Sequence, residues 1–124
     1  MSQEMNIQSA QKKLDTLRLK QKELASQLSA TEFIWNGSVG KRFLTCGTPS
    51  CHCHTDPEAK HGPYYYWTTK KAGKTVSRSL SEQQAEILKQ WIENRRELEH
   101  TLDEMKKLSQ EAYETILFIL DHSG

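Results

Sequence analysis

The side chains with the strongest chemistry in this chain are its cysteines and histidines. All three cysteines lie in the segment CGTPSCHC at 46–53, and three of the five histidines stand at positions 52, 54 and 61. Thiolate sulfur and imidazole nitrogen are preferred ligands of zinc, and four of them in a tetrahedron make a structural site. The spacing C-x4-C-x-C-x7-H predicts one Zn²⁺ per chain, held by Cys46, Cys51, Cys53 and His61.

Other chemistry is compatible with the same segment. His52 or His54 could replace His61 as the fourth ligand, and unmetallated or redox-active thiols, another metal or a cluster are further options. A catalytic zinc needs an open coordination position and a nearby carboxylate base. Asp56 and Glu58 lie in the loop, but no His-x-Glu signature occurs. We therefore expect a structural metal site in a protein that is not an enzyme.

Basic and aromatic residues surround the cysteine-rich segment. Lysine and arginine contact phosphates, and aromatic rings stack on bases. A hairpin with the tip KKAGK can also enter a groove of DNA. The predicted nucleic-acid contacts are Lys41, Arg42, Lys70, Lys71, Lys74, Arg78, Tyr65 and Trp67. One face of a small sheet must pack, however, and lysine at a hairpin tip also protects sheet edges.

Three short segments between residues 36 and 80 have strand composition: 41–46, 64–70 and 74–80. The residues from Lys70 to Gly73 form the predicted hairpin turn, in which glycine supplies the positive φ. Alternation places Tyr64 and Tyr66 on one face of the sheet, and Tyr65 and Trp67 on the other. Because so small a sheet cannot bury enough surface to fold alone, a metal staple is needed.

The segments on either side of this β module are predicted to be helices. Residues 1–35 carry a heptad seam formed by Ile7, Ala10, Leu14, Leu17, Gln21, Leu24 and Leu28. In residues 81–124 the helix begins with a capping box from Ser81 to Gln84. Its seam is Leu88, Trp91, Arg95, Leu98, Leu102, Met105, Ser109, Ala112, Ile116 and Ile119.

The sequence thus predicts a mainly α protein with a small β module. An antiparallel coiled-coil helical hairpin, residues 1–35 and 81–124, flanks the zinc-stapled three-stranded sheet of residues 36–80. The second helix is the longer, and we expect its apolar end ILFIL at 116–120 to extend beyond the first helix. Such a surface favours a homodimer formed through the helices, or a protein partner at the C-terminal helix.

Charge and composition limit the class of protein. The formal net charge is +1, but residues 32–80 have seven basic and three acidic residues, and residues 81–124 have five basic and ten acidic. The N-terminus lacks the apolar core of a signal peptide, and no apolar run is long enough to span a bilayer. Three cysteines cannot all pair with one another, and two of them are separated by a single residue. This pattern favours a bound metal in a reducing compartment over disulfides. We expect a cytoplasmic protein without membrane contacts.

The motifs CGTPSCHC at 46–53 and HGPYYY at 61–66, with Gly73-Lys74 and a long charged helix after them, resemble a known family. It comprises short bacterial and archaeal proteins, often linked to phages and other mobile elements, with a domain of unknown function. The similarity covers about residues 36–100 and implies a zinc-stapled β module followed by a helix. The family brings no established activity.

From the residues themselves, the expected function is non-enzymatic binding of nucleic acid, DNA in the first place. The resemblance suggests an accessory or regulatory factor of a mobile element or phage-related process. The alternative is a coiled-coil adaptor, whose zinc module presents aromatic side chains to a protein partner.

Overall fold

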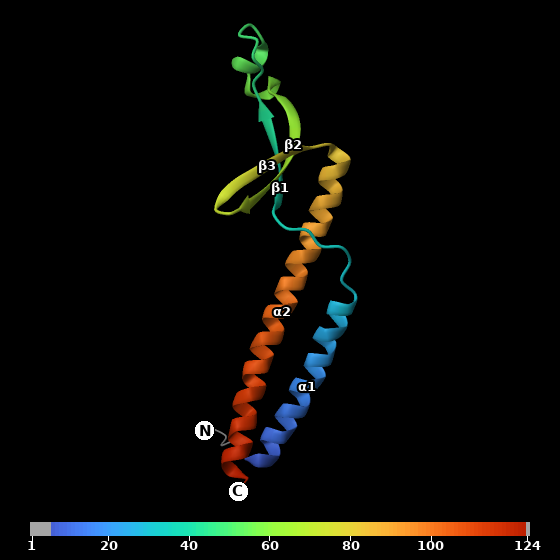
Figure 1. The fold of residues 1–124 in the computed structure, drawn as a ribbon, viewed down its shortest axis with the longest axis vertical. Coiled ribbons are helices and arrows are strands. Elements are labelled where there is room, and N and C mark those ends of the chain that lie inside the picture. The colour runs from blue at the N-terminus through green and yellow to red at the C-terminus, as the bar shows by residue number, and fades with distance from the viewer. Residues whose placement is uncertain (1–5, 124) are drawn as a thin grey trace. The chain divides into compact units, whose positions relative to one another are not determined.

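The computed structural model describes residues 6–123 and consists of two long helices and one small sheet (Figure 1). The elements in chain order are α1 (Ile7–Ser29), β1 (Ser38–Leu44), η1 (His52–His54), η2 (Pro57–Ala59), β2 (His61–Lys71), β3 (Lys74–Leu80) and α2 (Glu82–His122). The chain is therefore mainly helical with a three-stranded antiparallel module, as predicted.

The chain divides into two compact units. One, the helical unit, contains the residues up to Thr31 and from Arg96 onward, and the other, the β unit, is Glu32–Arg95. Helix α2 contributes to both. No helix within residues 6–123 is long and apolar enough to cross a bilayer.

Helix α1 turns its predicted seam away from solvent. Ala10 and Leu17 are buried, and the other five seam residues are half-buried, whereas every remaining described residue of α1 is exposed. The helix begins at a capping box in which Asn6 Oδ1 accepts from the Ser9 amide at 2.9 Å. The periodicity of this segment thus predicted correctly which face is covered.

Helix α2 departs from the predicted seam. Leu102 and Ile116 are 41% and 37% exposed, and their neighbours Thr101 and Thr115 are buried in their place. Both threonine hydroxyls donate to backbone oxygens one turn earlier, at 3.0 and 2.8 Å, so their burial leaves no polar atom unsatisfied. The error arose because a strict heptad count favours the bulkier apolar residue, whereas small residues allow a close approach.

The two helices of this unit run antiparallel, side by side (Figure 1). Gln27 near the end of α1 accepts from Thr101 at 3.4 Å, and Ile7 at its start shares a hollow with Phe118 and His122. The apolar end of α2 therefore does not extend beyond α1, contrary to the expectation. The interlocking of a true coiled coil stays a prediction.

The sheet has the order β1-β2-β3, and its register defines two faces. Direct pairs such as Tyr66 with Ser79, and Trp67 with Arg78, put paired residues on the same side. We call one side the Tyr66 face; it carries Arg42, Tyr64, Tyr66, Thr68, Lys70, Thr75, Ser77 and Ser79. The other, the Trp67 face, carries Val39, Lys41, Tyr65, Trp67, Thr69, Lys71, Lys74, Val76, Arg78 and Leu80.

Packing of the β unit concentrates on the Trp67 face. Trp67 lies 6.0 Å from Trp35, which lies 6.4 Å from Trp91 of α2, as measured between ring centroids. The Trp67 indole N–H donates to the Asn36 carbonyl at 2.8 Å. The Trp67 face is therefore the one on which the aromatic core forms.

The linker between α1 and β1 is held by polar side chains of α2. Asn94 donates to the Phe33 carbonyl at 2.8 Å, and Arg95 donates to the carbonyls of Trp35 and Gly37 at 2.8 and 3.3 Å. Helix α2 itself begins at the predicted capping box, with both reciprocal hydrogen bonds present between Ser81 and Gln84. Arg95, predicted as a seam residue, instead satisfies linker carbonyls.

A two-residue turn joins β2 to β3 and contains an unusual alanine. Lys71 pairs with Lys74, so Ala72 and Gly73 form the turn, with φ of 53° and 79°. Hairpin turns with two positive φ values favour Asn-Gly, and the left-handed region costs an alanine about 1–2 kcal/mol.

Ala72→Asn should therefore raise the free energy of unfolding by about 0.5–1 kcal/mol. Ala72→Val should lower it, because a β-branched side chain tolerates positive φ poorly. Urea midpoints of the metal-loaded variants measure both changes. Equal midpoints for the two variants would contradict this turn geometry.

Candidate metal centre

Four side chains converge at one end of the sheet. The ligand atoms of Cys46, Cys51, Cys53 and His61, which we call the Cys3His cluster, all lie within 4.8 Å of one another. Cys46 follows β1, Cys51 and Cys53 belong to the turn around η1, and His61 is the first residue of β2. The cluster thus joins the ends of two paired strands to the loop between them.

Two of the separations between ligand atoms suit a single tetrahedral ion. Cys51 Sγ is 3.5 Å from His61 Nε2, and Cys53 Sγ is 3.6 Å from Cys46 Sγ. Metal–ligand distances of about 2.3 Å for sulfur and about 2.0–2.1 Å for nitrogen give tetrahedral edges of about 3.6–3.8 Å. The cluster, whose ligand atoms all lie within 4.8 Å of one another, is therefore compatible with one metal ion.

The thiols are placed so that they lose protons at different pH values. Hydrogen bonding to the Thr48 backbone and to Cys53 lowers the pKa of Cys46 to about 6. The Cys53 backbone and the His61 ring lower the pKa of Cys51, whereas burial raises the pKa of Cys53. Hydrogen bonding to Cys51 raises the pKa of His61. Thiolates in contact with an imidazole are the state from which a metal ion is bound.

Backbone hydrogen bonds shape the loop around the sulfurs. The Cys46 amide donates to Cys53 Sγ at 3.3 Å, and the Cys51 amide donates to the Thr48 carbonyl at 3.1 Å. Amide donors to a sulfur stabilise its thiolate form. The Cys-Gly-Thr-Pro turn therefore positions one ligand and supplies part of the charge stabilisation.

The sheet is irregular where the histidine enters. Arg42 pairs with Tyr64 and Leu44 pairs with His61, so two residues of β2 stand opposite one residue of β1. Gly62 occupies this bulge with φ of 136°, and a Cβ there would lie 2.8 Å from the Arg42 carbonyl oxygen. A glycine at this point lets the strand turn His61 towards the sulfurs.

The alternative histidines lie outside the cluster. His52 and His54 are exposed in η1, and the group of ligand atoms within residues 6–123 includes His61. With four protein ligands the coordination of a tetrahedral ion is complete, which is the arrangement of a structural site.

The structure separates the residues predicted to contact nucleic acid. Arg42 and Lys70 lie on the Tyr66 face, and the other six lie on the Trp67 face. The six basic side chains are exposed, whereas Tyr65 and Trp67 are half-buried, Trp67 within the aromatic core.

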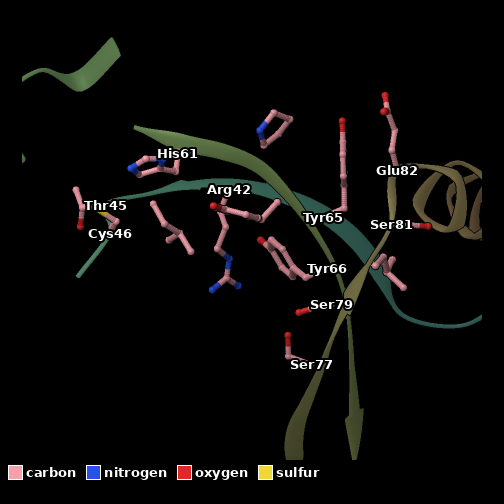
Figure 2. A pocket seen from close by; sticks show the side chains of 14 residues that line it. Arg42, Thr45, Cys46, His61, Tyr65, Tyr66, Ser77, Ser79, Ser81 and Glu82 are labelled. Atoms are coloured by element: carbon pink, nitrogen blue, oxygen red, sulfur yellow. The ribbon is translucent and has the colours of Figure 1, made fainter. Parts of the chain in front are cut away.

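Sequence reasoning missed a second feature of the sheet. The Arg42 guanidinium lies 4.0 Å over the centre of the Tyr66 ring, next to a groove of about 800 Å³ on the Tyr66 face (Figure 2). The alternation of the strand already placed Tyr64 and Tyr66 together. The position of Arg42 on the same face depends on the β1–β2 register, which no local pattern reveals.

Comparisons with known proteins place the chain in a family. The model of the family described as "Domain of unknown function (DUF6788)" matches residues 14–90, which include most of α1, the whole sheet and the Cys3His cluster. Neither a curated protein nor a solved structure gives a significant match. Because the family model covers more than half of the chain, this protein belongs to the DUF6788 family.

Proposed function

We propose that this protein is a non-enzymatic nucleic-acid-binding protein whose β unit is stapled by one Zn²⁺ in the Cys3His cluster. DNA is the expected partner. The resemblance of the motifs to phage-linked proteins suggests an accessory or regulatory role in a mobile element. Zinc is the ion proposed because three thiolates and one imidazole in a tetrahedron are a typical zinc ligand set.

The observation that carries the proposal is the uncompensated positive charge of the sheet. Residues 38–80 contain seven basic residues and only two acidic ones, Asp56 and Glu58. Among the described residues, none of the six basic side chains on the strands forms an ion pair. Bound Zn²⁺ with three thiolates subtracts about one charge and leaves the module clearly positive.

The arrangement of these charges opposes stability. Lys71 stands directly opposite Lys74, next to Lys70. Like charges in direct cross-strand pairs destabilise a sheet. The negative charge of a bound polyanion would relieve this repulsion. In addition, each lysine that neutralises a phosphate releases a condensed counterion, which favours binding.

Dimerisation through the helices is part of the proposal. Few described residues of the helical unit are buried. Tyr113, Leu117 and Leu120 of α2 are 62%, 39% and 64% exposed. A second copy would cover these side chains. It would also bring two basic sheets to one nucleic acid and raise the avidity.

The test is charge reversal at the hairpin tip. Lys70→Glu, Lys71→Glu and Lys74→Glu together should weaken binding to a DNA duplex at least tenfold at low salt. If the sheet neutralises about four phosphates, the wild-type protein should bind about 100-fold more weakly at 200 mM than at 50 mM salt. The triple variant should lose most of this salt dependence, as measured by fluorescence anisotropy during a salt titration.

The matched control reverses three exposed lysines of α1, Lys13, Lys20 and Lys22, which changes the net charge by the same amount. Equal losses for the two triple variants would show a nonspecific effect of net charge and contradict a binding site on the sheet. Absence of binding by the wild-type protein would overturn the proposed function.

A second candidate is the adaptor function, favoured by exposed apolar side chains beside the metal centre. Phe43, Leu44 and Tyr64 are 49%, 45% and 50% exposed, which suits anchors for a protein partner. Binding to nucleic acid that does not depend on salt, or no binding at all, would favour this alternative.

A further inference from the structure

The groove on the Tyr66 face lies between the metal centre and the start of α2. Its volume is about 800 Å³, and its lining includes Arg42, Tyr64, Tyr66, Ser77, Ser79 and His61. A space of this size fits a ligand of roughly drug dimensions. One or two nucleotides have such dimensions, whereas a duplex would lie across the groove without filling it.

The Arg42 side chain is positioned so that it can bind an anion. Its guanidinium carbon lies 4.0 Å from the centre of the Tyr66 ring, a cation–π contact that holds the cation over that face. Within residues 6–123 its side chain makes no ion pair or hydrogen bond, so its N–H groups remain available. A planar guanidinium with free donors suits two oxygens of one phosphate.

Tyr64 offers an unoccupied aromatic ring on the same face. It is 50% exposed, stands directly opposite Arg42 in the register, and takes part in no ring–ring contact among the described residues. Trp67 on the opposite face, by contrast, is engaged by Trp35 and by the Asn36 carbonyl. The ring that is free to stack on a base is therefore Tyr64.

The rest of the groove lining mixes neutral polar and apolar side chains with one carboxylate, that of Glu82. Ser77 and Ser79 of β3 point to the same side of the strands as Tyr66 and Arg42 (Figure 2), and hydroxyls can donate to or accept from base edges. The Glu82 side chain, at the far end of the lining, extends away from Arg42 in this view. The groove thus combines one cation, one stacking ring and neutral hydrogen-bonding groups, with a single carboxylate at the end formed by Glu82.

We propose that this groove binds unpaired nucleotides of a single-stranded nucleic acid, with Arg42 on a phosphate and the Tyr64 ring stacked on a base. Stacking on a side chain requires a base that is not already enclosed in a duplex. The inference rests on the proposed function and adds that the sheet prefers single strands. The Tyr66 ring contributes by supporting Arg42.

The test measures binding of full-length, metal-loaded protein to oligo(dT), to oligo(U) and to a DNA duplex. Tyr64→Ala should weaken binding to the single strands about 5- to 100-fold, the effect of one lost stacked base. Tyr64→Phe should retain the affinity, because the ring remains. Arg42→Gln should lower the slope of log affinity against log salt by about 0.7, whereas Tyr64→Ala should leave that slope unchanged.

The controls are Tyr113→Ala, which removes an exposed tyrosine of the helical unit, and Arg18→Gln, which removes an exposed arginine of α1. Neither should reproduce the loss at Tyr64, and melting curves confirm that each variant is folded. Unchanged single-strand binding by Tyr64→Ala, with binding still lost on charge reversal at the hairpin tip, overturns the groove but leaves the proposed function standing. If the wild-type protein binds none of the three oligonucleotides, both fail together.

Discussion

Removal of the metal is expected to unfold the β unit. Burial there is slight: the apolar residues with almost no exposure are Cys53, Ala85 and Ile92, and no large side chain is fully enclosed. Binding at a structural zinc site contributes about 10–16 kcal/mol, which is also folding free energy because the unfolded chain lacks the site. That contribution is as large as the whole stability of an ordinary domain, about 5–15 kcal/mol.

Cys53→Ser should have the same effect as a strong chelator, because Cys53 is the most buried ligand. Elemental analysis should give one zinc per folded chain. On chelation the fluorescence of Trp35, Trp67 and Trp91 should shift to longer wavelength as their cluster opens to water, and amide signals of the strands should lose dispersion. Signals from α1 report separately on the helical unit.

The two kinds of histidine in the loop provide a matched pair of variants. His61→Ala removes a ligand and should lower the metal affinity by orders of magnitude, whereas His52→Ala changes an exposed side chain outside the cluster and should not. A protein that stays fully ordered after stoichiometric removal of its metal would contradict the staple. Equal effects of His61→Ala and His52→Ala would contradict the proposed ligand set.

Local patterns predicted much of the fold. The capping box at Ser81, the seam of α1 and the hairpin between β2 and β3 are each encoded within a few residues, and each was predicted, although the hairpin turn is Ala72–Gly73 and not the longer Lys70–Gly73. The ligand atoms also lie together as predicted, because a short loop between paired strand ends keeps them close.

What could not be predicted depends on contacts between distant segments. Heptad periodicity assigned Arg95 to an apolar seam, yet its role is to donate to linker carbonyls almost 60 positions earlier in the chain. Trp67 was predicted to contact nucleic acid because an indole ring can stack on bases, but Trp35 packs against it and Trp91 packs in turn against Trp35. Sequence identifies which side chains can stack, and tertiary packing decides which of them remain free.

The metal centre and the proposed groove share part of their walls, since Cys46 and His61 line both. The strand segment between the two sites carries the bulge at Gly62. Any change that displaces the start of β2 should therefore weaken metal binding first and reshape the groove as a consequence. A substitution at Gly62 tests this coupling without replacing a metal ligand or one of the groove side chains.

Gly62→Ala should destabilise the metal-loaded β unit by about 1–3 kcal/mol, because φ of 136° is open almost only to glycine. The new Cβ would also lie 2.8 Å from the Arg42 backbone oxygen, which cannot move without breaking the β1–β2 ladder. His61 should then reach the sulfurs less well, and zinc affinity measured against a chromophoric chelator should fall about 5- to 150-fold.

Gly47→Ala is the matched control in the same loop, since a Cβ there would meet no atom within 4 Å and its φ is not positive. It should leave stability and zinc affinity close to those of the wild-type protein. If both alanines are tolerated equally, the bulge does not aim His61, and the cluster must be held by the Cys46–Cys53 loop alone. If Gly62→Ala lowers stability but not zinc affinity, the strain is confined to the sheet and the coupling between ladder and metal is absent.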